Sequence, residues 1–253
     1  MAISLQTNNT SYSSKTGTSL TISINVGSGS NRFLMVAVFT EYNNATPTAT
    51  YNSVSMTRTL TRQYDDYHTA RHLHIFTLAN PSSGSHNFVV SCSNSGLITG
   101  GYSVYNGVNQ TTPVPTTAYG SKSSSKTCEA TLTIANANSW LLATMATGNG
   151  HNASEWGVGS GTTKRGFMFG FSTVQAGANY DSNGGLATGS RTLTASNTNA
   201  DNWGVWIALE LAEAAASPSG PAHLKTWNVV AIANIKTING VPIANVKTWN
   251  GIN

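Results

Sequence analysis

Two histidines separated by one residue, His72 and His74, are the first residues whose spacing suggests chemistry. Alternate residues of a β-strand point to the same side of a sheet, so the two imidazoles can share one metal ion such as Zn²⁺. Phe76 and Leu78 continue the same face, however, which is equally the pattern of packed or hydrogen-bonded histidines. Two ligands without an evident third and fourth make a weak metal site. We therefore expect no bound metal and no other cofactor, and keep His72 and His74 as weak candidates.

The nine acidic residues do not form a recognisable catalytic pair. No local E-x-D-x-x-E arrangement of the kind found in sandwich-fold glycosidases is present, although two carboxylates from distant strands can still meet as such a pair. The G-x-S-x-G, Walker and H-E-x-x-H motifs are also absent from the sequence. The sequence therefore predicts a protein that is not an enzyme, with glycoside hydrolysis as the third choice of function.

Aromatic side chains in loops suggest another chemistry, the binding of carbohydrate. Trp and Tyr rings pack against the C–H surfaces of sugars, while Asn and Ser side chains bind the hydroxyl groups. Most aromatic residues here fall in strand-like segments and are expected in the core. A carbohydrate-binding adhesin or receptor-binding module is therefore the alternative function. The loop candidates for a glycan site are Tyr64, Tyr67, Trp156 and Tyr180.

Composition excludes several kinds of partner. Charged residues make up only 9% of the chain, well below the roughly 25% of an average soluble domain. The formal net charge is +4 and the basic residues are scattered, so we expect no nucleic-acid partner. No apolar run approaches the roughly 18 residues of a membrane span, and the N-terminal segment lacks the basic and apolar regions of a secretory signal. We expect a polar, mostly uncharged surface and no membrane insertion.

The two cysteines, Cys92 and Cys128, are too few for a disulfide framework or a zinc site. Each shares a strand phase with apolar residues, which favours two buried core thiols. A disulfide between Cys92 and Cys128 remains the alternative.

The dominant period along the chain is two, which is the pattern of half-buried β-strands. Gly, Asn, Ser and Pro separate the strand-like segments, so the sequence predicts an all-β fold, an antiparallel jelly-roll-like β-sandwich over residues 1–213. In its last segment we expect Trp203, Val205, Ile207, Leu209 and Leu211 to share one face. The predicted strands are 18–26, 31–39, 70–78, 86–92, 128–135, 139–146 and 202–212.

A change of composition marks the end of the sandwich. Residues 214–222 are small and rich in Pro and Gly, which suits an exposed linker. Residues 223–253 then repeat a pattern every eleven residues, in which Lys225-Thr226 recurs as Lys236-Thr237 and again eleven residues later. We expect this short segment to form a separate tail of β-hairpin repeats.

The residues of the repeat favour hairpins over a helix. Asn239-Gly240 is a type I′ turn sequence, Pro242 disfavours a helix, and Ile, Val, Thr and Trp prefer strands. Ile238 should then oppose Val241, Thr237 should oppose Pro242, and Lys236 should oppose Ile243, which leaves apolar groups on both faces of the hairpin.

Such a tail needs a partner surface, because about 31 residues are below the roughly 40 that usually bury a core of their own. It can fold back on its own sandwich, associate with other copies of the chain, or dock on a larger assembly. We expect an assembly interface with other copies, a trimer being preferred because three ribbons can enclose a dry centre. The expected interface residues are Trp227, Ile235, Ile238, Val241, Ile243, Val246, Trp249 and Ile252.

Several stretches resemble virion proteins of tailed bacteriophages. One resemblance is to the β-sandwich domains of such proteins and of some bacterial surface proteins, and it covers residues 31–42, 101–114 and 202–212. A second, in residues 235–252, is to the short N-G-V/I repeats that end phage appendage and structural proteins. The resemblance implies a structural virion component made in the host cytoplasm, multimeric and without a cofactor. It would decorate a capsid or form part of a tail or head fibre, contacting other virion proteins and, through the outward sandwich, a host-surface glycan. An extracellular or cell-surface location is the alternative.

Overall fold

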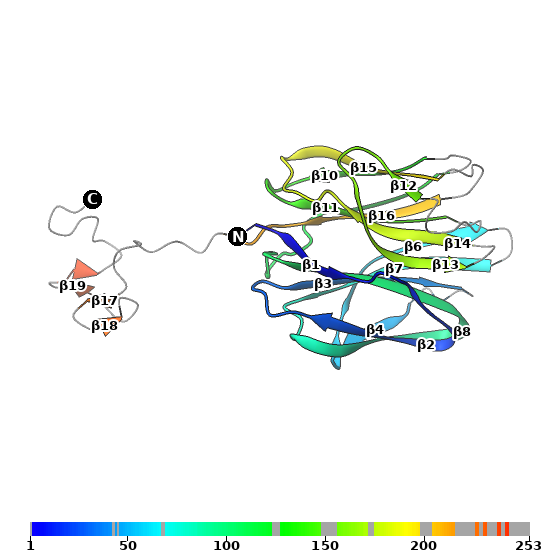
Figure 1. Ribbon diagram of the computed structural model, residues 1–253, viewed down its shortest axis with the longest axis horizontal. Coiled ribbons are helices and arrows are strands. Elements are labelled where there is room, and N and C mark those ends of the chain that lie inside the picture. Colours follow the sequence, from blue (N-terminus) through cyan, green and yellow to red (C-terminus); the bar gives the residue numbers. More distant parts are fainter. Residues whose placement is uncertain are drawn as a thin grey trace. The chain divides into compact units, whose positions relative to one another are not determined.

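The computed structural model shows an all-β protein in two compact units, residues 1–215 and 216–253, each described here by itself (Figure 1). Every regular element in the described part of the chain is a β-strand, which confirms the predicted all-β class. Accordingly, no helix among these residues is long and apolar enough to cross a membrane. The structure describes residues 2–41, 44, 46–66, 69–122, 127–147, 156–171, 175–197, 204–215, 226–227, 230–231, 237–238 and 241–242.

The first half of the larger unit is one sheet folded into two layers. The long strand β8 belongs to both layers: residues 84–91 pair with β2 and β4, and residues 98–106 pair with β3 and β1. The first residues of β2, 13–17, also pair with residues 96–100 of β8, so β2 too passes from one layer to the other. The second layer continues from β3 through β7 to β6. The strands of this half are β1 (Ser4–Asn8), β2 (Ser13–Val26), β3 (Phe33–Thr40), β4 (Thr48–Tyr51), β5 (Val54–Ser55), β6 (Thr57–Asp66), β7 (Thr69–Ala79) and β8 (Gly84–Asn106).

The second half of this unit is a sandwich of two separate sheets. One has the order β10-β15-β12 and the other the order β13-β14-β11-β16-β9, and all their pairings are antiparallel. The strands are β9 (Thr117–Lys122), β10 (Thr127–Ile134), β11 (Trp140–Thr147), β12 (Trp156–Val158), β13 (Thr163–Phe171), β14 (Gln175–Asp181), β15 (Gly189–Asn197) and β16 (Gly204–Leu211).

The two halves have the same strand order. For this comparison the two parts of β8 are counted as the seventh and eighth strands of the first half, and the short β5 is left out. In each half the first strand then pairs with the eighth (β1 with β8, β9 with β16) and the second with the seventh (β2 with β8, β10 with β15). The third strand pairs with the sixth (β3 with β7, β11 with β14). This nesting is that of a jelly roll. The unit therefore contains two copies of one sandwich, the first repeat (β1–β8) and the second repeat (β9–β16), where the sequence pattern predicted one.

Two backbone features recur at equivalent places in the repeats. Gly84 and Gly189 end the pairing of the second and seventh strands, and their φ angles are 101° and 106°. Asn31 and Asn138 precede the third strand, with φ angles of 54° and 63°. Gly and Asn adopt positive φ more readily than other residues, so both repeats use the same turn chemistry at these corners.

Three hydrophobic cores separate four stacked layers (Figure 1). One core lies inside each repeat, and the third, the central core, lies between the two repeats. The central core is built from equivalent strands on both sides: β3, β7 and β8 contribute residues such as Phe33 and Tyr105, and β11 and β16 contribute residues such as Trp140 and Leu211. Since Phe33 pairs with Tyr105 and Trp140 with Leu211, the repeats meet through corresponding faces.

The predicted strands are found, with one difference in burial. Each of the seven predicted segments overlaps a strand of the structure. In β16, Val205, Ile207, Leu209 and Leu211 line the central core as predicted, and Trp203 lies outside the described residues. The opposite face is buried as well, because Ala208 belongs to the core of the second repeat. A strand between two sandwiches has no solvent face.

The two cysteines lie in different cores. Cys128 is buried in the core of the second repeat, whereas Cys92 packs at the edge of the core of the first repeat. Neither takes part in a disulfide, so the structure contains the two separate thiols favoured by the sequence and not the alternative bond between them. Burial raises the pKa of the Cys92 thiol to about 11, which keeps it protonated and unreactive at neutral pH.

Within the smaller unit, the described residues form two antiparallel strand pairs of identical register. In the first, β17 (Thr226–Trp227) pairs with β18 (Val230–Ala231), and in the second, β19 (Thr237–Ile238) pairs with β20 (Val241–Pro242). The pairs Ile238 with Val241 and Thr237 with Pro242 confirm the register predicted from the Asn-Gly turn. The predicted pair of Lys236 with Ile243 lies outside the described residues.

Candidate functional site

The histidine pair lies in the interior of the first repeat. His72 and His74 are 2% and 0% exposed, and their rings stack with centroids 5.7 Å apart. The two nitrogens of His74 contact the hydroxyl groups of Thr40 and Thr61, at 3.2 Å from Nε2 and 2.9 Å from Nδ1. A metal ion could reach a His74 nitrogen only by displacing one of these hydroxyls. The described residues also contain no group of three or more His, Cys, Asp or Glu side chains placed to hold a metal ion.

Burial determines the charge state of His74. Its removal from water, followed by the positive charges of His72 and Arg58, lowers its pKa from 6.5 to about 3. The ring is therefore neutral in the folded protein at physiological pH, with one nitrogen as donor and the other as acceptor. Each threonine hydroxyl can both donate and accept, so either tautomer is satisfied. These contacts fit a structural histidine better than a metal ligand.

Of the predicted glycan-site residues, Tyr180 is described with its side chain, and it does not lie in a loop. Tyr180 was assigned to a loop, but it lies in β14 and is 0% exposed, in the core of the second repeat. The assignment was wrong because the strand alternation of β14 continues through Tyr180 and ends at the turn after it. Trp156 begins β12, and Tyr64 lies within β6, but their side chains are outside the described part. Tyr67 lies outside the described residues.

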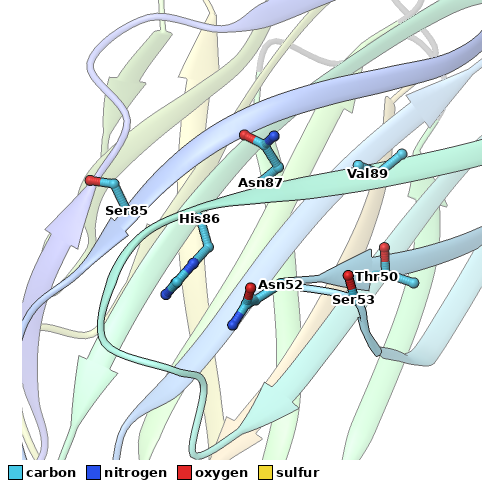
Figure 2. Close-up of a pocket in the computed structure, with 7 residues that line it drawn as sticks. All are labelled: Thr50, Asn52, Ser53, Ser85, His86, Asn87 and Val89. Atoms are coloured by element: carbon cyan, nitrogen blue, oxygen red, sulfur yellow. The ribbon is translucent and has the colours of Figure 1, made fainter.

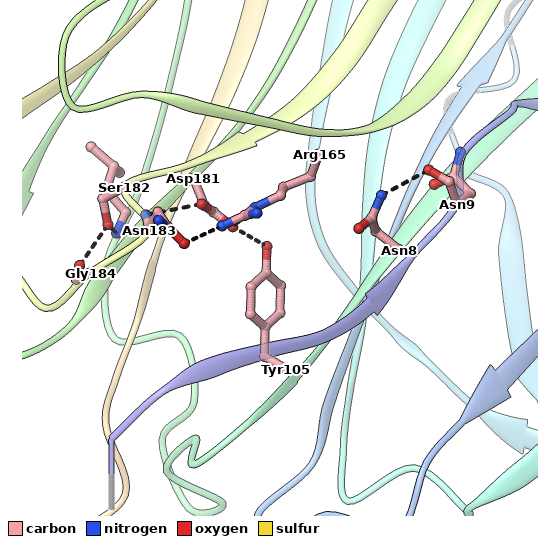
Figure 3. A network of polar contacts seen from close by, with 9 residues as sticks. Asn8, Asn9, Tyr105, Arg165, Asp181, Ser182, Asn183 and Gly184 are labelled. Carbon is pink, nitrogen blue, oxygen red and sulfur yellow. Dashed lines mark hydrogen bonds and ion pairs between the residues drawn. The ribbon is translucent and has the colours of Figure 1, made fainter.

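A buried carboxylate, Asp181, joins the two repeats (Figure 3). It is 0% exposed, and its Oδ2 accepts hydrogen bonds from Arg165 Nε at 2.7 Å and from the hydroxyl of Tyr105 at 3.1 Å. Arg165 and Asp181 belong to the second repeat, and Tyr105 is on β8 of the first. Arg165 also donates to the Asn183 side chain at 2.6 Å. A buried charge is costly unless it is paired and hydrogen-bonded, and here both conditions are met.

Asp181 also organises the turn that follows it. Its Oδ1 accepts the backbone N–H of Asn183 at 3.0 Å, while the Ser182 hydroxyl donates to the Gly184 carbonyl at 2.9 Å (Figure 3). Asn183 has a φ of 47°. Asp181 and Asn183 therefore form an Asx-type turn.

Tyr105 remains a hydrogen-bond donor at any physiological pH. Burial, and then the negative charge of Asp181, raise the pKa of Tyr105 well above its ordinary value. A second close approach of the repeats occurs nearby, where a Cβ added at Gly166 would collide with the side chain of Asn9. The polar contacts at Asp181 thus hold the repeats in one register and leave the carboxylate no open side toward a substrate.

Glu210 is a second buried carboxylate, and its hydrogen bonds stabilise the turn between β10 and β11. It is 0% exposed and accepts hydrogen bonds from the backbone of Ala135 at 2.9 Å and of Asn136 at 2.8 Å, and from the hydroxyls of Ser139 and Thr116, each at 2.8 Å. Burial alone raises the pKa of Glu210, but these hydrogen bonds outweigh it and lower the pKa below its ordinary value. Glu210 is therefore an ionised structural anchor.

The described part of the predicted assembly interface consists of Trp227, Ile238 and Val241, which lie in the hairpins of the smaller unit. Trp227 and Ile238 hold the same place in successive hairpins, each opposite a valine across the turn. The other predicted interface residues lie outside the described residues: Ile235, Ile243, Val246, Trp249 and Ile252.

Sequence patterns did not identify a polar hollow on the first repeat, at the β4–β5 hairpin (Figure 2). Its residues come from two segments more than 30 positions apart, residues 50–53 and 85–89. Two of them, Asn52 and Ser53, have positive φ angles of 48° and 64°, as a type I′ turn requires. Asn-Ser was the only local sign of this turn.

Comparisons with protein-family models, with curated protein sequences and with solved structures find no match for this chain.

Proposed function

We propose that this chain is a non-enzymatic structural component of a larger particle, joined to other copies of itself through its C-terminal hairpin repeat. The resemblance to phage virion proteins makes a capsid decoration or a tail or head fibre the preferred setting. The double sandwich is the displayed part, and residues 223–253 are the assembly element.

One observation carries the proposal, the recurrence of one hairpin register at a spacing of eleven residues. Trp227 pairs with Val230, and Ile238 pairs with Val241. Each strand of these hairpins is only two residues long, and an isolated two-stranded hairpin is at best marginally stable in water. Repeated units with apolar residues at fixed places stabilise one another by stacking or by docking on a partner.

The third unit of the sequence repeat extends the same pattern. Asn250-Gly251 corresponds to Asn239-Gly240, and Trp249 and Ile252 stand where Ile238 and Val241 stand one unit earlier. In a column of Trp227, Ile238 and Trp249, the two tryptophans would be aromatic anchors of the kind that dominate interfaces, each contributing about 2 kcal/mol or more. Three chains can surround such a column, and we therefore expect a trimer.

Deletion of residues 223–253 tests the proposal. The truncated chain should keep the double sandwich, with unchanged far-ultraviolet circular dichroism and thermal midpoint, but should sediment as a monomer. Trp249→Ala should weaken association about tenfold or more without lowering the thermal midpoint of the sandwiches. Lys247→Ala is the matched control, because its side chain is expected to be solvated. Unfolding of the sandwiches on deletion, or undiminished association, would contradict the proposal.

A further inference from the structure

The outer face of the first repeat carries a hollow of about 400 Å³ where the β4–β5 hairpin lies beside the start of β8 (Figure 2). This volume lies within the range of about 300–1,000 Å³ that is usual for small-molecule sites. The hollow is lined by Thr50, Asn52, Ser53, Ser85, His86, Asn87 and Val89.

The backbone of the hollow is fixed by strand pairing. Thr50 is paired with Val89 in the β4–β8 ladder, and the backbone N–H of Asn52 donates to the carbonyl of Asn87 at 3.0 Å. The side chains of Asn52, Ser53 and Asn87 are exposed and available to solvent. A rigid backbone with free polar side chains is the arrangement that preorganised binding sites use.

His86 has a defined orientation at the inner side of the hollow. Its Nε2 lies 3.0 Å from the carbonyl oxygen of Ser83, and its ring meets the buried ring of Tyr51 edge-on, with centroids 5.7 Å apart. A carbonyl only accepts hydrogen bonds, so Nε2 carries the proton and Nδ1 of the neutral ring is an acceptor. In Figure 2 the imidazole of His86 and the amide of Asn52 project toward the same region.

The chemistry of the lining selects a class of ligand. None of the seven lining residues is an acid, a lysine or an arginine, so an ion of either sign lacks a counter-charge there. Hydroxyl and amide groups both donate and accept hydrogen bonds, and Val89 and the methyl group of Thr50 add a small apolar surface. Tyr51 is 0% exposed, so no aromatic face of the hairpin is open for stacking a planar base.

We propose that this hollow binds a neutral saccharide, whose hydroxyl groups and C–H surfaces match the polar and apolar parts of the lining. The amide of Asn52 and Nδ1 of His86 bind sugar hydroxyls from one side of β8, and the amide of Asn87, which projects from the other side of that strand, binds a further hydroxyl at the rim (Figure 2). The site lies within the first repeat and does not depend on the C-terminal tail. A failure of saccharide binding and a failure of the proposed assembly function are therefore separate experimental results.

The second repeat provides an internal control. Its strand β15 carries Arg191 and Thr192 where β8 has His86 and Asn87, as the equivalent pairings starting from Gly189 and Gly84 show. Around the end of β12 it has Gly157, Gly159 and Gly161, without the side chains that line the hollow. The saccharide site is therefore expected in the first repeat alone.

Titration of the isotope-labelled full-length chain with galactose, N-acetylglucosamine and maltose tests the proposal by heteronuclear NMR. At least one of these sugars should shift the amide signals of residues 50–53 and 85–89 in a saturable way. The site is shallow and open, so the expected dissociation constant is on the order of 1 mM. Galacturonate, an anionic comparator, should bind no more tightly than galactose. Deletion of residues 223–253 should leave the shifts unchanged.

Two matched variants complete the test. Asn87→Ala should weaken binding at least about fivefold, since it removes an amide that binds a sugar hydroxyl, whereas Thr192→Ala at the equivalent place of the second repeat should have no effect. Both side chains are exposed, and equal thermal midpoints verify that both variants fold. The proposal is overturned if no sugar gives saturable shifts up to about 50 mM, if the shifts map elsewhere, or if the two variants bind alike.

Discussion

The buried imidazole of His74 should make the stability of the sandwiches depend on pH. In the folded protein its pKa is lowered from 6.5 to about 3, because burial excludes water and because His72 and Arg58 are nearby. In the unfolded chain the ring is solvated and takes up a proton below about pH 6.5. The unfolded state then binds more protons than the folded state, so the free energy of unfolding falls as the pH falls from about 6.5 toward 3.

The size of this effect follows from the two pKa values of His74. At about 1.4 kcal/mol per pH unit, His74 should cost the protein about 2 kcal/mol of unfolding free energy between pH 7 and pH 5, and about 4 kcal/mol by pH 3. The ring is 0% exposed, so solvent screening does not reduce this figure. His74→Gln removes the titrating group and keeps a side chain that can bond Thr40 and Thr61.

Urea denaturation at pH 7, 6 and 5 measures the effect. From pH 7 to pH 5 the free energy of unfolding of the wild-type chain should fall by about 2 kcal/mol more than that of His74→Gln. This comparison of slopes holds whatever the difference in stability between the two proteins at pH 7. Parallel pH curves for the wild type and His74→Gln would refute the assignment of a neutral, buried His74.

Three further outcomes are expected from the other buried contacts. Glu210→Gln should lower the free energy of unfolding by about 1–3 kcal/mol at pH 7. Because the folded pKa of Glu210 is lowered, its stabilising contribution is present above about pH 4.3 and lost below it. In urea denaturation the free energy of unfolding of the variant should therefore fall less steeply with acidification than that of the wild type. Tyr105→Phe should cost about 1.5–3 kcal/mol by removing a hydrogen bond to the charged Asp181, whereas Tyr119→Phe, at a residue 53% exposed, should cost less than about 0.5 kcal/mol; equal costs in thermal denaturation would contradict the role of Asp181. Gly84→Ala and Gly189→Ala should each lower stability by about 1–2 kcal/mol through their positive φ angles, and clearly unequal losses would argue against equivalent corners in the two repeats.

Local patterns in the sequence predicted the strands and the tail hairpin correctly. β3 alternates little and is buried along its whole length, yet its β-branched and aromatic content was sufficient. The register of Ile238 with Val241 followed from Asn239-Gly240, because a two-residue turn determines which residues face each other. Both inferences needed only neighbouring residues.

The duplication was not predictable in the same way. Equivalent core positions of the two repeats hold different residues, such as Phe33 and Trp140, because a core accepts many apolar side chains of suitable size. Turn residues with special backbone angles recur, as at Gly84 and Gly189. Strand order is a property of pairing between distant segments, and it became visible only in the structure.

Distance along the chain also explains the errors at the candidate sites. The prediction of Tyr180 as a loop residue is wrong because the pairing of β14 with β11, a distant segment, buries it. The partners of Asp181 come from residues 105 and 165, and the hollow combines residues 50–53 with residues 85–89. No local pattern connects such segments, since folding alone brings them together.

The mass of the intact chain in solution tests most directly whether the C-terminal repeat is an assembly element. One chain has a mass of 26.5 kDa, so a trimer has 3 × 26.5 = 79.5 kDa. Light scattering on the full-length protein, coupled to size-exclusion chromatography, should give the trimer mass over a range of concentrations, and the monomer mass after deletion of residues 223–253. A mass of 26.5 kDa for the full-length chain at every concentration would contradict assembly through the repeat.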